Sequence, residues 1–153
     1  MRKMMLLALA AGLMTAACAA QAPQYQARSA GERYGYAEQQ VEPNRVRISY
    51  NGDSMTPRET VETYLLYRAA EATLERGYDS FLIVAHDVQD NTSYEGMGTV
   101  RPGMGGVRQI TSHNALADIV MFEGHPPGNP NLYDAHAVQQ SLETRIVRGE
   151  EQH

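Results

Sequence analysis

The sequence predicts a two-layer α+β domain, with two helices on one face of an antiparallel-dominated sheet of about four strands. Three observations predict this class. Several short segments have the apolar alternation or the apolar runs of strands, one long segment and one short segment have helical spacing, and their order is β-β-α-β-β-α without a repeat. Strand–turn–strand pairs with only two helices favour antiparallel pairing. We expect a single domain over residues 34–147.

The first two strands are predicted at residues 34–40 and 45–50, joined through a turn at Glu42-Pro43-Asn44. In the second strand, Val46, Ile48 and Tyr50 alternate with polar residues. Since successive side chains of a strand point to opposite faces, one face of this strand should be buried and the other solvated.

A long helix is predicted from Thr56 to about Arg76. Thr56 and Glu59 have the spacing of a capping box, with Pro57 at the first helical position. Gly77 supplies a left-handed stop. The apolar stripe that should face the sheet consists of Val61, Leu65, Ala69 and Ala72, with Tyr64 and Leu66 on its shoulders.

Two further strands are predicted at residues 80–88 and 117–122, both apolar on both faces and therefore central in the sheet. Residues 89–109 hold five glycines and little apolar periodicity, so we expect a long mobile loop there. Residues 110–116 should lead into the fourth strand.

The last part of the domain is predicted to be a surface turn over residues 124–131 followed by a second helix. Asp134 is the expected N-cap, and Val138 and Leu142 should face the core. Residues 148–153 are charged and are expected to fray.

The N-terminus has the pattern of a bacterial lipoprotein signal. A basic start, an apolar run over residues 4–14 and the small residues Thr15-Ala16-Ala17 precede Cys18, the only cysteine. Residues 1–17 are therefore predicted to be a signal peptide and Cys18 the lipidation site, with residues 18–33 as a flexible tether. The alternative is ordinary export, with cleavage within residues 16–20 and no lipid.

The charge balance excludes several classes of functional site. The chain has 13 basic and 18 acidic residues, and loss of Arg2 and Lys3 with the leader leaves 11 and 18, a net charge of −7. No lysine then remains, which excludes a Schiff-base lysine or a phosphate-loop lysine. A net acidic domain is a poor nucleic-acid binder. Its charge should also not hold it to anionic lipid, so we expect membrane attachment to come through acyl chains.

Two motifs resemble a family of short proteobacterial lipoproteins of unknown function. The first is the helix segment Arg58 to Glu71, of the pattern R-x-T-V-E-x-Y-L-L-Y-R-A-A-E, and the second is Ile119 to Gly124, I-V-M-F-x-G. The resemblance covers most of residues 34–147. It implies a location in the cell envelope and implies no catalytic residues. Since Ala19 follows the cysteine, the resemblance implies the outer membrane, facing the periplasm.

Three other groups of residues resemble sites. Ser54 lies in a Gly-Asp-Ser block like that of serine esterases and would need His136 or His113 as its base. Residues 86–95, from His86 to Glu95, could bind a cation as a metal-responsive sensor, although they lack calcium-loop spacing. The glycines of residues 96–106 lack the strand-to-helix context of a phosphate loop.

Arg68 lies by helical angle at the margin of the apolar stripe, in a helix that also carries Glu62, Glu71 and Glu75. We expect it to snorkel or to form an ion pair that orients the helix on the sheet. The alternative is an arginine that faces a partner.

The sequence as a whole favours a non-enzymatic cell-envelope lipoprotein that binds or scaffolds another envelope component, a protein or peptidoglycan. We expect no catalytic residues, no cofactor and no metal site. The alternatives are a serine hydrolase that uses Ser54 and a metal-responsive periplasmic binding protein. The alternative location is the soluble periplasm.

Overall fold

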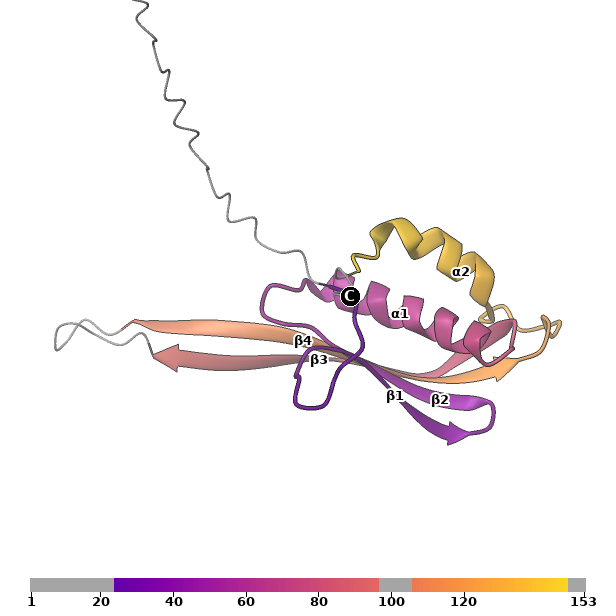
Figure 1. Ribbon diagram of the computed structural model, residues 1–153, viewed down its shortest axis with the longest axis horizontal. Coiled ribbons are helices and arrows are strands. Elements are labelled where there is room, and N and C mark those ends of the chain that lie inside the picture. The colour runs from indigo at the N-terminus through magenta and orange to yellow at the C-terminus, as the bar shows by residue number, and fades with distance from the viewer. Residues whose placement is uncertain (1–23, 97–105, 149–153) are drawn as a thin grey trace, which may run out of the picture.

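The computed structural model describes residues 24–96 and 106–148 and shows a five-stranded antiparallel sheet with two helices on one face (Figure 1). The strands are β1 (Gly35–Glu42), β2 (Arg45–Asn51), β3 (Ser80–Gly96), β4 (Val107–Phe122) and β5 (Tyr133–Asp134), in the sheet order β1-β2-β4-β3-β5. The helices are α1 (Arg58–Glu75) and α2 (Ala135–Leu142), followed by a short 3-10 turn, η1 (Glu143–Arg145). The predicted α+β class and element order are confirmed.

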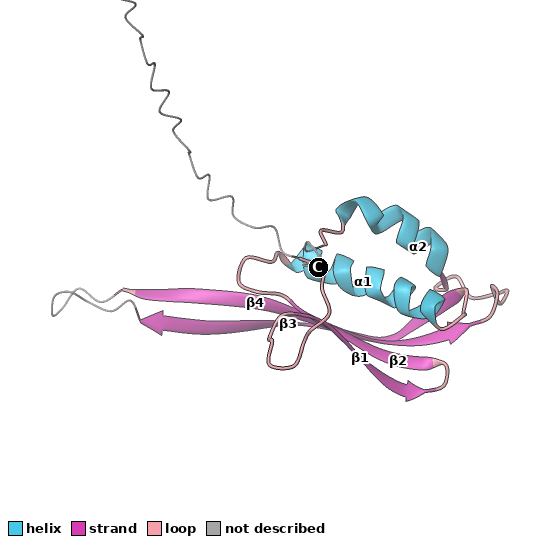
Figure 2. Ribbon diagram, in the orientation of Figure 1, coloured by secondary structure: helices cyan, strands magenta, loops and turns pink. Residues whose placement is uncertain are grey.

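The core lies between α1 and the sheet. Val46, Ile48 and Tyr50 of β2 are buried, as their alternation predicts, and they face the buried stripe of α1. Ala115, Ala117, Ile119 and Met121 continue this face on β4. Val138 and Leu142 of α2 pack against the same core, as predicted. Helix α2 lies on the side of α1 away from the sheet (Figure 2).

Helix α1 begins differently from the prediction. Its N-cap is Pro57, and no side chain caps it. The Thr56 hydroxyl instead donates to Asp53 Oδ1 at 2.6 Å, and Glu59 pairs with Arg145 at 2.5 Å. The predicted capping box is therefore wrong, because Asp53 takes the hydroxyl that would have capped the helix. The predicted stop at Gly77 is confirmed by its φ of 80°.

The predicted mobile loop at residues 89–109 is also wrong over its described part. Strand β3 continues to Gly96 and pairs with β4 from Val107, so that the two strands form a long hairpin. This hairpin projects well beyond the helices (Figure 1). The five glycines of the predicted loop fall at or between these strand ends, and residues 97–105 lie outside the described residues.

Strand β3 is not covered on both faces as predicted. Its register with β4 shifts between Ile83 and Ala85, and the bulged Val84 is 46% exposed. Among the described residues, only the two of β5 pair with its outer edge, at Ser80 and Phe81. The remaining length of β3 is therefore an edge of the sheet.

The predicted boundaries of the domain shift at both ends. Tyr25, within the predicted tether, is 6% exposed and donates its hydroxyl to Glu71. Its backbone N–H donates to Val147 O at 2.6 Å, and it forms a parallel bridge with Arg148. The predicted flexible tether over residues 18–33 is thus wrong at Tyr25, and the predicted fraying of residues 148–153 is wrong at Arg148. Cys18 and residues 149–153 lie outside the described residues.

Candidate functional site

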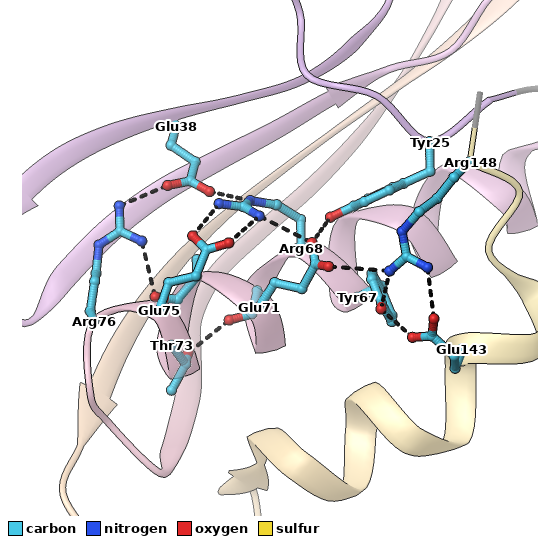
Figure 3. A network of polar contacts seen from close by, with 12 residues as sticks. Tyr25, Glu38, Tyr67, Arg68, Glu71, Thr73, Glu75, Arg76, Glu143 and Arg148 are labelled. Carbon is cyan, nitrogen blue, oxygen red and sulfur yellow. Dashed lines mark hydrogen bonds and ion pairs between the residues drawn. The ribbon is translucent and has the colours of Figure 1, made fainter. Parts of the chain in front are cut away.

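Arg68 lies at the centre of a buried polar network between α1 and β1 (Figure 3). Its guanidinium bonds to Glu38 of β1, to Glu71 at 3.0 Å, and to both oxygens of Glu75 at 2.9 and 2.6 Å. It also lies 4.6 Å from the centroid of the Tyr36 ring. Arg68 is thus an internal ion-pair residue that holds the helix against the sheet, which confirms the first interpretation of its position.

The pKa values of Arg68 and Tyr25 are both raised in this network. Burial lowers the pKa of Arg68, but hydrogen bonds to Glu75 and Glu38 outweigh it and leave the pKa raised. Burial, together with the hydrogen bond to Glu71, raises the pKa of Tyr25, so its phenol stays neutral and donates. The network continues through Arg148, which contacts Tyr67 at 2.6 Å and Glu143 at 2.7 Å.

The predicted catalytic groups are not assembled in the described part of the chain. Ser54 forms no hydrogen bond with a described histidine. His113 points to the helix side of the sheet, where its ring bonds to Asp90 at 2.7 Å. His136 lies in the first turn of α2. Glu62, the other charged residue singled out on α1, pairs with Arg58 at 3.0 Å.

The residues of the predicted cation loop lie on strand β3 instead. Extended backbone alternates its side chains between two faces, so His86 and Asp90 share one face while Glu95 is on the other. Among residues 24–96 and 106–148, no group of three or more histidine, cysteine, aspartate or glutamate side chains could hold a metal ion. Within the same residues, no helix is long and apolar enough to cross a membrane.

A cavity of about 550 Å³ opens where the β3–β4 hairpin leaves the body of the domain. It lies on the face of the sheet that the helices leave uncovered, because Ser112 and Asn114 alternate with the helix-facing residues of β4. The segment before β1, which hangs below the sheet in Figure 1, forms its other wall. The lining side chains are Arg28, Glu32, Arg33, Tyr34, Asn51, Ser54, Ser93, Glu95, Ile110, Ser112 and Asn114.

Backbone contacts hold the wall of this cavity in place. Arg28 N donates to Tyr36 O at 2.8 Å, and Tyr36 N donates to Gln26 O at 2.9 Å. Asn51 Nδ2 donates to Arg33 O at 3.1 Å. Gly35, with φ 107°, allows this close approach, since a Cβ there would lie 2.6 Å from Gln26 O.

Close packing also shapes the floor of the cavity beside the start of the helix. Gly52 N donates to His113 O at 2.9 Å, which joins the end of β2 to the base of the hairpin. A Cβ at Gly52 would lie 2.7 Å from Val61 Cγ2 and 2.9 Å from Thr56 Cβ. The Gly-Asp-Ser block that resembles an esterase motif is therefore the turn that packs β2 against α1, and it places Ser54 on the rim of the cavity.

Two of the charges at this cavity are unpaired arginines. Among the described residues, neither the Arg28 nor the Arg33 guanidinium forms an ion pair or a hydrogen bond. Most other described arginines are paired: Arg45, Arg47, Arg58, Arg68, Arg76, Arg145 and Arg148. No sequence motif marks Arg28 or Arg33, because both lie in the segment predicted to be a tether.

A second cavity of about 190 Å³ adjoins the first on the same face. It shares Asn51 and Asn114 with the larger cavity and adds Ser49, Asp87 and Gln89. The two together form a polar groove across the sheet, from the segment before β1 toward the middle of β3 and β4.

Comparison with protein-family models, curated proteins and solved structures finds no match for this chain. The groove therefore carries the functional argument.

Proposed function

We propose that this protein is a non-enzymatic lipoprotein of the bacterial outer membrane that faces the periplasm and binds another component of the envelope. The predicted leader over residues 1–17, directly before Cys18, supports this location. The resemblance of the Arg58–Glu71 and Ile119–Gly124 motifs to short proteobacterial lipoproteins supports it independently.

The observation that carries the binding role is the groove on the uncovered face of the sheet. It combines a cavity within the usual size range of ligand sites with polar side chains from the wall, β2 and both hairpin strands. Two arginines at its edge have no partner within the described residues, whereas the Arg68 network satisfies its own charges internally. Both guanidiniums are exposed to solvent, so a ligand in the groove can reach them.

The address is tested by intact mass and fractionation. The membrane-extracted protein should begin at Cys18 and carry acyl groups, and Cys18→Ala should lose both the added mass and the membrane location. An unmodified soluble product that starts within residues 16–20 would overturn the proposal of a lipid anchor.

The binding role is tested by crosslinking in intact cells. A photoreactive group placed at Ser93, on the groove, should yield a crosslinked adduct, and the same group at Glu59, an exposed position on α1 outside the groove, should not. Adducts of equal yield at both positions, or none at Ser93, would contradict a binding role for this face.

A further inference from the structure

We propose that the groove binds an acidic oligosaccharide, a sugar chain that carries a carboxylate. The proposal deepens the proposed function, which supplies the envelope as the source of the sugar. It rests on three features of the groove: its floor, its two free guanidiniums and its exposed aromatic ring.

The floor consists of neutral side chains that both donate and accept hydrogen bonds. Asn51 and Asn114 are neighbours across β2 and β4, and Ser93 and Ser112 line the hairpin beside them. An amide has two donors and an acceptor, and a hydroxyl has one donor and two acceptors. Sugar hydroxyls need this mixture, because each of them donates one hydrogen bond and accepts others.

The two carboxylates of the larger cavity fit the same ligand. Glu32 and Glu95 line it, and carboxylates accept hydrogen bonds from hydroxyl groups. A small inorganic anion would be repelled by both of them. A polyol that carries one localised negative charge satisfies all of these groups, provided that its charge lies at the arginines.

Arg28 and Arg33 supply the place for that charge. Guanidinium groups bind carboxylates through two parallel N–H donors, and such charge-assisted bonds are about twice as strong as neutral ones. Both arginines lie on the wall segment, which is anchored to β1 and β2 through Tyr36 and Asn51. The carboxylate should therefore lie against the wall while the sugar ring lies over the strands.

Tyr34 provides an apolar surface at the same end. Its side chain is 46% exposed although it lies next to the sheet, and Ile110 lines the cavity as well. Aromatic rings offer a large apolar face at low entropic cost, which suits the C–H face of a sugar ring. The adjoining cavity, which shares Asn51 and Asn114, gives room for the chain to continue along the sheet.

The test uses two disaccharides that differ in one lactyl group, which carries the carboxylate. The acidic probe is N-acetylglucosaminyl-N-acetylmuramic acid, and the neutral probe is the N-acetylglucosamine dimer, which lacks the lactyl group. Calorimetric titration of the mature, detergent-solubilised protein should give at least about tenfold tighter binding of the acidic probe. Arg28→Gln/Arg33→Gln should remove this preference, and Asn114→Ala should weaken binding of both probes.

The control is Arg58→Gln/Arg145→Gln, which changes the net charge equally but lies outside the groove. It should leave both affinities unchanged. Equal affinities for the two probes, no binding of either, or an equal loss in the control would overturn the proposal. A protein that is not acylated but still prefers the acidic probe would refute the lipid anchor alone, so the two failures are distinguishable.

Discussion

Replacement of Arg68 by methionine tests whether the polar network holds α1 on the sheet. Methionine keeps most of the apolar stem but removes the guanidinium, which bonds to Glu38, Glu71 and Glu75. The loss in the free energy of unfolding depends on the partners that each carboxylate keeps after the substitution. The Glu75 side chain is 54% exposed and regains water, so its loss is small.

The other two carboxylates, Glu38 and Glu71, keep only some of their hydrogen-bond and ion-pair partners. Glu38 is left with Arg76 at 2.7 Å, and Glu71 is left with the Tyr25 hydroxyl and with Arg148 at 3.5 Å. Removal of one partner from a fully buried pair costs about 3–5 kcal/mol. With these remaining contacts, and with the loss of the cation–π contact to Tyr36, we expect Arg68→Met to cost about 2–4 kcal/mol.

Urea unfolding followed by far-UV circular dichroism measures this change in the free energy of unfolding. Arg58→Gln is the matched control, because it removes an exposed pair with Glu62 four residues along the same helix and should cost less than about 0.5 kcal/mol. If Arg68→Met costs no more than this control, the network does not hold the helix and the reasoning is refuted.

Two further predictions concern the uncovered face and its wall. Hydrogen bonds from Arg47, outweighing the effect of burial, hold the pKa of Asp118 below its ordinary value. The contribution of Asp118 to the free energy of unfolding is therefore present above about pH 4 and is lost as the pH falls through the lowered pKa. Asp118→Asn should lower stability at pH 7 and flatten the acid side of a curve of stability against pH. An unchanged acid side would contradict this. Gly35→Ala places a Cβ 2.6 Å from Gln26 O at a residue with φ 107°, and should lower the free energy of unfolding by at least about 1 kcal/mol in thermal unfolding. Gly31→Ala, the control, has a φ of 92° but nothing within 4 Å of the added Cβ, and should cost less. Equal costs would show that the wall is not closely packed.

The sequence predicts well those elements whose apolar residues repeat with the period of a strand or helix and face one core. The alternation of Val46, Ile48 and Tyr50, the stripe of α1, the stop at Gly77 and the cap at Asp134 were all predictable from local pattern. Asp134 accepts a hydrogen bond from Ala137 N at 2.8 Å, as an N-cap should. In each case a short stretch of chain contains the whole signal.

The errors come from contacts that no local pattern encodes. The outer parts of β3 and β4 have both faces exposed, so residues such as Asn91 and Thr92 show no apolar alternation and resemble a loop. Tyr25 is a single aromatic residue in a polar segment, and elements that follow it in the chain bury it: β1 through Tyr36, α1, and the C-terminal segment. The groove arises in the same way, because Arg28 meets Asn114 only after the wall, β2 and β4 are assembled.

The attachment of Tyr25 also determines how the domain responds to mechanical load. A pull on the chain ahead of Gln24 reaches the fold first at Tyr25, through the bond to Val147 O, the Glu71 contact and the bond from the Tyr50 hydroxyl to Gln24 O at 2.9 Å. These few bonds can rupture while the ladder between β2 and β4 stays intact. Their release would pass the load to the wall segment, which its bonds to Tyr36 and Asn51 hold in place, so tension at the N-terminus would act on the groove before it reaches the central strands.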